Sequence, residues 1–158
     1  MDEPDIAPEP ERLLYLEDIF VGQRFGSDTY ELDEAEIKRF ALAYDPQPFH
    51  LDEVAARDTI FRGLAASGWH TAAITMRLIV TGAQRFAGGV IGAGASVEWP
   101  QPTRAGDVLR VEGEVLEITP SRSKPDRGRV RVRNRTLNQR DEVLQLMEAN
   151  LVVMRRPG

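Results

Sequence analysis

The chain has 158 residues, of which 42% are hydrophobic and 28% are charged, and these values predict a single soluble globular domain with a buried core. Its formal net charge of −5 argues against nucleic acid as the main partner, because phosphate binding favours a basic surface. The absence of cysteine excludes disulfides, thiolate catalysis and cysteine metal sites, and it fits a reducing compartment.

The start of the chain is acidic and rich in proline. Residues 1–12 cannot bury enough apolar surface to offset the entropy lost on ordering, so we expect a disordered tail followed by one domain over residues 13–158. The tail lacks the apolar core of a signal peptide, and no later apolar run approaches the roughly 20 residues of a membrane span. We therefore expect a cytoplasmic protein that does not bind a membrane.

The first elements of the domain are a strand and a helix. Apolar anchors precede Gly22, which should turn the chain into a strand over residues 23–32. Asp33 is a good N-cap, and Glu36 lies three residues further on, as in a capping box. The helix that follows has one apolar face, formed by Ile37, Phe40, Ala41 and Tyr44. Packing of this face should fix the position of Asp45 at the end of the helix.

The stretch from Phe40 to Asp52 reads Phe-Ala-Leu-Ala-Tyr-Asp-Pro-Gln-Pro-Phe-His-Leu-Asp, and it holds one of the two histidines. Its two prolines should stop the helix and stiffen the bend that carries Asp45 and His50. An aspartate before proline is ordinary turn chemistry, and a lone histidine is more often structural. A rigid Asp–His pair instead suits acid–base catalysis, because small misplacements lower the rate steeply. Asp52 is expected to cap a short helix that runs through Ala56.

The strongest helical signal runs from Ser67 to Phe86, after an irregular segment at residues 59–66. Its apolar stripe consists of Trp69, Ala72, Ala73, Met76, Ile79, Val80 and Ala83. Ile74 and Leu78 make other sides apolar too, and a helix that is apolar nearly all round is normally buried. His70 faces away from the stripe, which favours a structural or surface role.

Four strands are expected after this helix, over residues 90–99, 107–119, 129–137 and 142–154. Leu109, Val111, Gly113 and Val115 alternate with polar residues, and Val130 and Val132 alternate with arginines. Consecutive strands after one long buried helix predict an α+β fold with an antiparallel sheet.

The stretch around Asp45 and His50 resembles the MaoC-like dehydratases and (R)-specific enoyl-CoA hydratases of the hot-dog fold. The aspartate, proline, histidine and trailing Asp52 match that family's motif at its spacing, whereas Tyr44 replaces the usual glycine and Gln47 the usual asparagine. The resemblance extends through residues 64–69 and 99–107, and so covers most of the chain. It implies a single hot-dog domain, with a curved antiparallel sheet wrapped around the long central helix.

The resemblance also implies a reaction and a site. The reaction would interconvert a trans-2-enoyl thioester, expected to be an acyl-CoA, and its 3-hydroxyacyl thioester. Asp45 and His50 would hold one water between them, and the Gly68 amide would hold the thioester oxygen. Ser67, Gln47 and Tyr44 are candidate substrate contacts. No cofactor beyond the substrate's CoA is implied, and a homodimer or larger homo-oligomer is expected, because one domain would leave sheet edges unpaired.

Two other classes remain open. A thioesterase of the same fold would use a carboxylate and water on the carbonyl, without needing His50. A non-catalytic acyl-CoA-binding subunit is the second alternative. Tyr44 and Gln47 favour it, because they replace motif residues that directly support Asp45 and His50. Five cationic side chains could contact CoA phosphates: Arg57, Arg62, Arg104, Arg122 and Lys124. For any one of them, a solvated surface charge is the more ordinary interpretation. Two histidines without further organised ligands predict no metal site.

Overall fold

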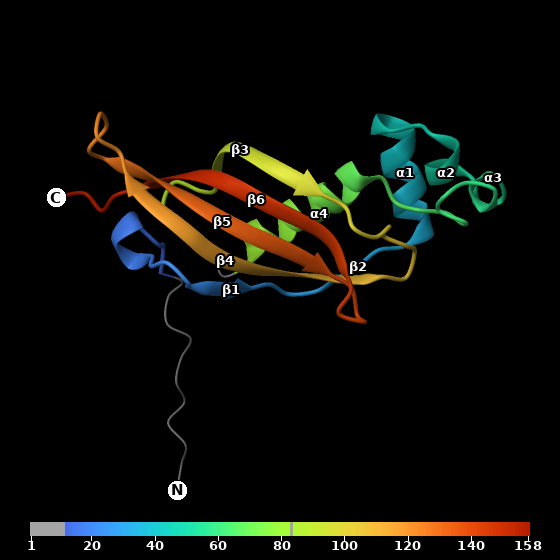
Figure 1. Ribbon diagram of the computed structural model, residues 1–158, viewed down its shortest axis with the longest axis horizontal. Helices are drawn as coiled ribbons and strands as arrows, with labels where there is room; N and C mark the ends of the chain where they lie inside the picture. The colour runs from blue at the N-terminus through green and yellow to red at the C-terminus, as the bar shows by residue number, and fades with distance from the viewer. Residues whose placement is uncertain (1–11, 83) are drawn as a thin grey trace, which may run out of the picture.

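The computed structural model describes residues 12–82 and 84–158, so the tail expected over residues 1–12 lies outside the described residues except for Arg12. Figure 1 shows one antiparallel sheet with a long helix behind it. The elements are η1 (a 3-10 helix, Leu16–Asp18), β1 (Arg24–Gly26), β2 (Tyr30–Glu31), α1 (Glu34–Tyr44), α2 (Pro48–Leu51), α3 (Glu53–Arg57), α4 (Gly68–Thr81), β3 (Ile91–Glu98), β4 (Val108–Pro120), β5 (Arg127–Leu137) and β6 (Val143–Met154). These elements confirm the α+β class.

The sheet has the strand order β1-β4-β5-β6-β3, and β2 also pairs with β4. The four long strands match their predicted positions and differ only at their ends. Val130 and Val132 are fully buried, which confirms the alternation predicted for β5. The arginines that alternate with them lie on the other face of the sheet, where Arg131 and Arg133 form ion pairs with Glu148 of β6. Strand β3 is exposed along almost its whole length, and it lies at one edge of the sheet.

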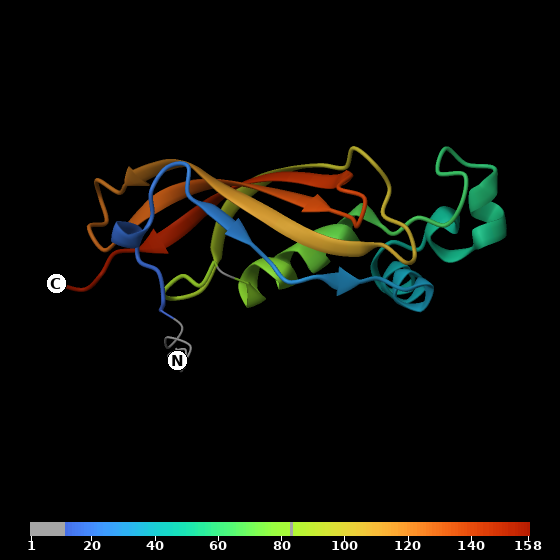
Figure 2. The same cartoon turned by 90° about the horizontal axis from the view of Figure 1, so that it is seen from below.

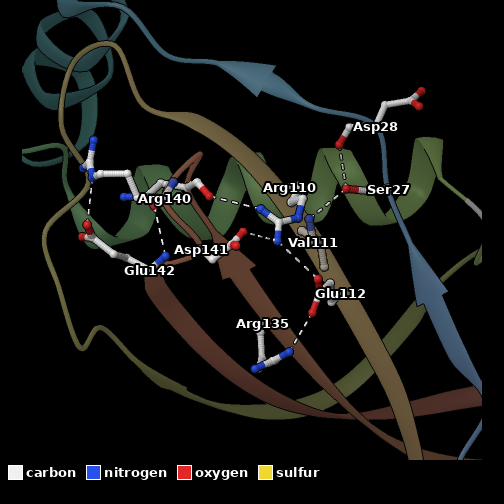
Figure 3. Close-up of polar contacts among 10 residues, drawn as sticks. Ser27, Asp28, Arg110, Val111, Glu112, Arg135, Arg140, Asp141 and Glu142 are labelled. Atoms are coloured by element: carbon white, nitrogen blue, oxygen red, sulfur yellow. Dashed lines mark hydrogen bonds and ion pairs between the residues drawn. The ribbon is translucent and has the colours of Figure 1, made fainter.

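The single strand expected over residues 23–32 is instead the two short strands β1 and β2. Figure 3 shows what replaces the missing strand hydrogen bonds. The Ser27 hydroxyl accepts a hydrogen bond from the Val111 backbone N–H at 2.8 Å, between the register pairs Gly26–Glu112 and Tyr30–Leu109. A side chain therefore satisfies an amide of β4 that a continuous strand would have paired.

The turn between β5 and β6 is held by an arginine on β4. Arg110 donates to the Asn138 carbonyl oxygen at 3.1 Å and to the Asp141 carboxylate at 2.7 Å (Figure 3). Asp141 has a φ of 61°, so it needs such support more than a glycine would. A fixed turn fixes the register of the two strands, and that register places Thr136 opposite Gln145.

Helix α4 is shorter than predicted, because it ends at Thr81 and not at Phe86. The chain passes very close to its neighbours at Gly82. A Cβ atom at this position would lie 2.8 Å from the Leu78 carbonyl oxygen and 3.2 Å from that of Gly26 in β1. Only glycine fits here, so the helix stops where it meets the sheet.

The expectation that α4 is buried nearly all round was wrong, because one of its faces is exposed. In the predicted stripe, Trp69 is 61% exposed, and Met76 and Val80 are also exposed. The face that packs on the sheet carries His70, Thr71, Ile74, Thr75, Leu78 and Ile79. The apolar pattern identified Ile74, Leu78 and Ile79 but could not identify the two threonines and the histidine that belong to the same buried face. Ala83 lies outside the described residues.

Helices α1 to α3 gather at one end of the sheet, beside the start of α4 (Figure 2). The predicted capping box of α1 is confirmed, since Asp33 accepts from the Glu36 N–H and Glu36 reaches back to the Asp33 N–H. Asp52 caps α3 as expected. Helix α2 was not predicted, because the stretch after Asp45 was interpreted as a bend, but Pro48 begins a four-residue helix there.

Candidate active site

Asp45 ends α1, and its carboxylate gathers several partners. Its backbone N–H bonds to the Ala41 carbonyl oxygen at 2.8 Å, which holds the residue on the last turn of the helix. Oδ1 accepts a hydrogen bond from the Gln47 amide at 2.6 Å, and Oδ2 accepts one from the Ser67 hydroxyl at 2.7 Å. The side chain is 18% exposed, so solvent still reaches it.

These partners set the charge state of Asp45. Burial raises the pKa of the carboxyl group, but the hydrogen bonds from Gln47 and Ser67 and the positive charge of a protonated His50 outweigh burial. The pKa of Asp45 is therefore held below its usual value of 3.8. Asp45 is a carboxylate at neutral pH, able to accept a proton or a hydrogen bond.

His50 is buried on α2, with both ring nitrogens engaged. Nδ1 lies 2.6 Å from the Ala65 carbonyl oxygen, and a carbonyl can only accept, so we assign the proton to Nδ1. Nε2 then faces Asp45 Oδ2 at 3.2 Å. This is direct contact, so a water held by both groups would bind beside them rather than between them. A proton on Nε2 would complete a charged hydrogen bond, and its loss would leave two acceptors that face each other.

The carbonyl of Ala65 belongs to a loop that Arg104 holds in place. The Arg104 guanidinium donates to the carbonyl oxygens of Gly63 and Leu64 at 2.9 and 3.0 Å, and also to that of Phe61. Arg104 was one of the candidate phosphate contacts, but its guanidinium donates to backbone carbonyl oxygens instead. This role could not be predicted, because the partner carbonyls lie about forty positions away in the chain.

Gly68 is the first residue of α4 and follows the N-cap Ser67. The Ser67 hydroxyl accepts from the Trp69 N–H at 3.3 Å while it donates to Asp45, so one side chain joins the helix start to the carboxylate. The Gly68 N–H has no acceptor in the described part of the chain, as is usual for a first-turn amide. A Cβ at Gly68 would lie 2.6 Å from the indole of Trp99, so only glycine lets the two meet.

A cleft of about 560 Å³ opens beside this group of residues. One side comes from α2 and the loop after α3, one from the start of α4, and one from residues 99–103 that follow β3. Its lining residues are Gln47, Phe49, His50, Ile60, Phe61, Ala66, Gly68, Thr71, Trp99, Pro100, Gln101, Pro102 and Thr103. His50 and Gly68 thus line one cavity. Asp45 lies just behind its lining and contacts it through His50 and Gln47, and Ser67 donates its hydrogen bond to Asp45.

The other candidate residues lie apart from the cleft lining. Tyr44 is 76% exposed and contacts the ring of Phe40. His70 is buried and stacks on the ring of Phe40, with 4.4 Å between the two ring centroids. Burial lowers the pKa of His70 below its ordinary 6.5. His70 therefore has the structural position that its place on the helix predicted.

Metal ligation and membrane insertion can both be assessed over residues 12–82 and 84–158. Within these ranges no three His, Cys, Asp or Glu side chains gather as a metal ion would need. No helix there combines the length and apolar character required to span a bilayer.

Comparison with known proteins gives a consistent result. The model of the "MaoC like domain" family matches residues 20–138. A 3-hydroxybutyryl-CoA dehydratase of Methylorubrum extorquens is 31% identical, over 72% of this chain and 71% of its own.

Two solved structures extend the likeness to the whole fold. The MaoC-like dehydratase of Rhodospirillum rubrum is 59% identical, covers 92% of this chain and 99% of its own, and superposes with a TM-score of 0.90. The R-hydratase PhaJ1 of Pseudomonas aeruginosa is 29% identical, covers 90% of this chain and 86% of its own, and has a TM-score of 0.71. The fold is therefore the predicted hot-dog fold, and the chain belongs to the family of MaoC-like dehydratase domains.

Proposed function

We propose that this protein is a hydratase and dehydratase that interconverts a trans-2-enoyl thioester and its 3-hydroxyacyl thioester. The observation that carries the proposal is the contact between Asp45 and His50, at 3.2 Å, beside a cleft that is also lined by Gly68 at the start of α4. An acid–base pair and a backbone donor on one cavity are what water addition to an enoyl thioester requires.

In the hydration direction, the thioester oxygen accepts a hydrogen bond from the Gly68 N–H at the positive end of α4. A water molecule in the cleft, bound against His50 with the Asp45 carboxylate behind it, adds its oxygen to the β-carbon. The pair takes up one proton from that water and delivers one proton to the α-carbon, so the pair ends the reaction as it began. Dehydration reverses each step. The fixed Nδ1–H of His50 leaves only Nε2 to exchange the proton.

The cleft suits an acyl thioester. Its sides carry the apolar side chains of Phe49, Ile60 and Phe61, which fit an acyl group. A neighbouring hollow shares Ile60 and is lined by Arg57 and Arg62. Neither guanidinium has an ion-pair partner among the residues that the structure describes. We propose that CoA is the thiol and that its phosphates bind there. The relative from Methylorubrum extorquens is named for an acyl-CoA substrate, which supports this choice.

A homodimer is the second part of the proposal. Two surface features favour self-association. The face of α4 with Trp69, Met76 and Val80 is apolar and exposed, and the edge strand β3 is exposed as well. Pairing of two β3 edges would remove an open sheet edge, and we propose that the α4 side chains are covered in the same dimer. Light scattering coupled to size-exclusion chromatography should give twice the chain mass, and a mass equal to one chain would contradict this part.

The test of the reaction is the loss of enoyl absorbance when purified protein meets crotonyl-CoA, with free thiol measured in the same sample. We expect absorbance loss without thiol release. Thiol release would instead support a thioesterase. Tight acyl-CoA binding with neither signal would support a non-catalytic binding subunit.

A further inference from the structure

The buried part of the cleft lining is polar. Ile60 is 91% exposed and marks the mouth, whereas Thr71 and Thr103 are 1% and 3% exposed and mark the inner end. Their hydroxyl groups lie 2.8 Å apart, so a hydrogen bond joins α4 to the segment before β4 across this inner end.

Trp99 forms the adjoining part of the lining and is anchored from behind. Its indole lies against Gly68, and it meets the ring of Trp69 edge-on at 5.2 Å. The indole N–H donates to the side-chain oxygen of Gln145 on β6 at 2.9 Å. Gln145 is fully buried, so an exposed aromatic ring is held by a group inside the protein.

The space behind this lining is also filled by hydrogen-bonded polar groups. Gln145 donates to the Thr75 hydroxyl at 3.1 Å, and the Thr75 and Thr136 hydroxyls lie 2.6 Å apart. Thr75 donates its own hydrogen to the Thr71 carbonyl oxygen at 2.8 Å. We call Thr71, Thr75, Thr103, Thr136 and Gln145 the polar wall. It connects α4 to both β5 and β6 at the depth where a longer ligand would have to go.

The direction of entry decides what meets the polar wall. The CoA phosphates are proposed to bind at Arg57 and Arg62, in the hollow that shares Ile60 with the mouth of the cleft, so the acyl end enters first. A long methylene chain would have to separate the bonded hydroxyls and bury them without partners. Each polar group left unpaired in this way lowers affinity on the order of tenfold, and a methylene group offers no hydrogen bond in return.

We propose that the polar wall closes the inner end of the cleft, so that the protein takes short acyl thioesters and rejects long unbranched ones. The proposal rests on the function proposed above for the same cleft, and it narrows the class of substrate. Thr71, Thr103 and Gln145 act as specificity-determining residues.

The test compares binding and turnover of short and long thioesters. Binding of the unreactive butyryl-CoA and octanoyl-CoA is measured by calorimetry, and turnover of crotonyl-CoA and trans-2-octenoyl-CoA by absorbance. We expect the eight-carbon compounds to bind and react at least tenfold less well than the four-carbon ones. In the double variant Thr71→Ala, Thr103→Ala, which removes both hydroxyls of the inner end, this preference should fall at least fivefold. Because each ratio is taken on one protein sample, partial loss of stability does not alter it.

The matched control is Thr81→Ala, on the same helix but exposed, with its hydroxyl bonded to the Arg77 carbonyl oxygen. Its preference should equal that of wild type. Octanoyl-CoA that binds wild type as tightly as butyryl-CoA would overturn the inference, even if crotonyl-CoA is hydrated. An unchanged preference in the double variant would overturn it as well. A strong binding preference for butyryl-CoA without any turnover would uphold the inference and overturn the hydratase proposal. Absence of binding by either ligand would overturn both.

Discussion

Replacement of Gly68 by alanine tests the geometry of the proposed thioester site, because it keeps the backbone donor and changes only the space around it. The added Cβ would lie 2.6, 2.7 and 2.8 Å from three atoms of the Trp99 indole. Ordinary carbon contacts are about 3.5–4.0 Å, so the ring or the start of α4 must move by roughly 1 Å. Overpacking of this kind costs about 1–3 kcal/mol of stability. A displacement of about 1 Å in a reacting group can lower the rate on the order of 100-fold.

The assay has two parts. Urea unfolding of Gly68→Ala should show a loss of about 2 kcal/mol, and kcat/KM for crotonyl-CoA should fall on the order of 100-fold. Adding Trp99→Leu to Gly68→Ala should remove the collision. The double variant should therefore lose about 1 kcal/mol less stability than the sum of the losses in the two single variants. Wild-type stability and activity in Gly68→Ala would refute the argument, since they would mean that the indole does not lie on the helix start.

Three further predictions concern the residues around the pair. Ser67→Ala removes a donor that lowers the pKa of Asp45, so the acid limb of the pH profile of kcat/KM should move to higher pH; an unmoved limb would contradict this. His70→Phe keeps the stack on Phe40. Because burial lowers the folded-state pKa of His70, wild type should lose stability as pH falls below 6.5, whereas the variant should lose less between pH 7.5 and 5.5 in urea titrations. Arg104→Met should lower the free energy of unfolding by about 2–4 kcal/mol, because three carbonyls lose a charged donor. The matched control Arg57→Met should have little effect. Equal losses of stability in the two variants would contradict the role assigned to Arg104.

The features that could be predicted from the sequence are those set by near neighbours in the chain. The capping box at Asp33 and Glu36 spans three positions, and the alternation of β4 and β5 repeats every second residue. Asp45 and His50 are five positions apart, so the proline-containing motif was enough to predict that they lie close together. Their actual contact depends on α2, a helix too short to give a periodic pattern.

The features that could not be predicted depend on distant partners. Threonine on a helix reads as a polar residue that faces solvent, but Thr75 is buried because Thr136 and Gln145 satisfy its hydroxyl from across the sheet. Polar residues therefore share the buried face of α4, and apolar residues such as Trp69 lie on its exposed face. Likewise, Trp99 could be recognised as part of the site only once its ring was seen against Gly68.

The most direct test of the proposed mechanism is crotonyl-CoA hydration by wild type, Asp45→Asn and His50→Gln, each checked for wild-type folding by circular dichroism. Asn and Gln are close in size to the residues they replace, and they remove the proton-exchanging group of each. We expect clear turnover by wild type and a loss of at least about 100-fold in each variant, as is typical when an acid–base group is removed. Folded variants that hydrate crotonyl-CoA as fast as wild type would contradict the assignment of the reaction to this pair.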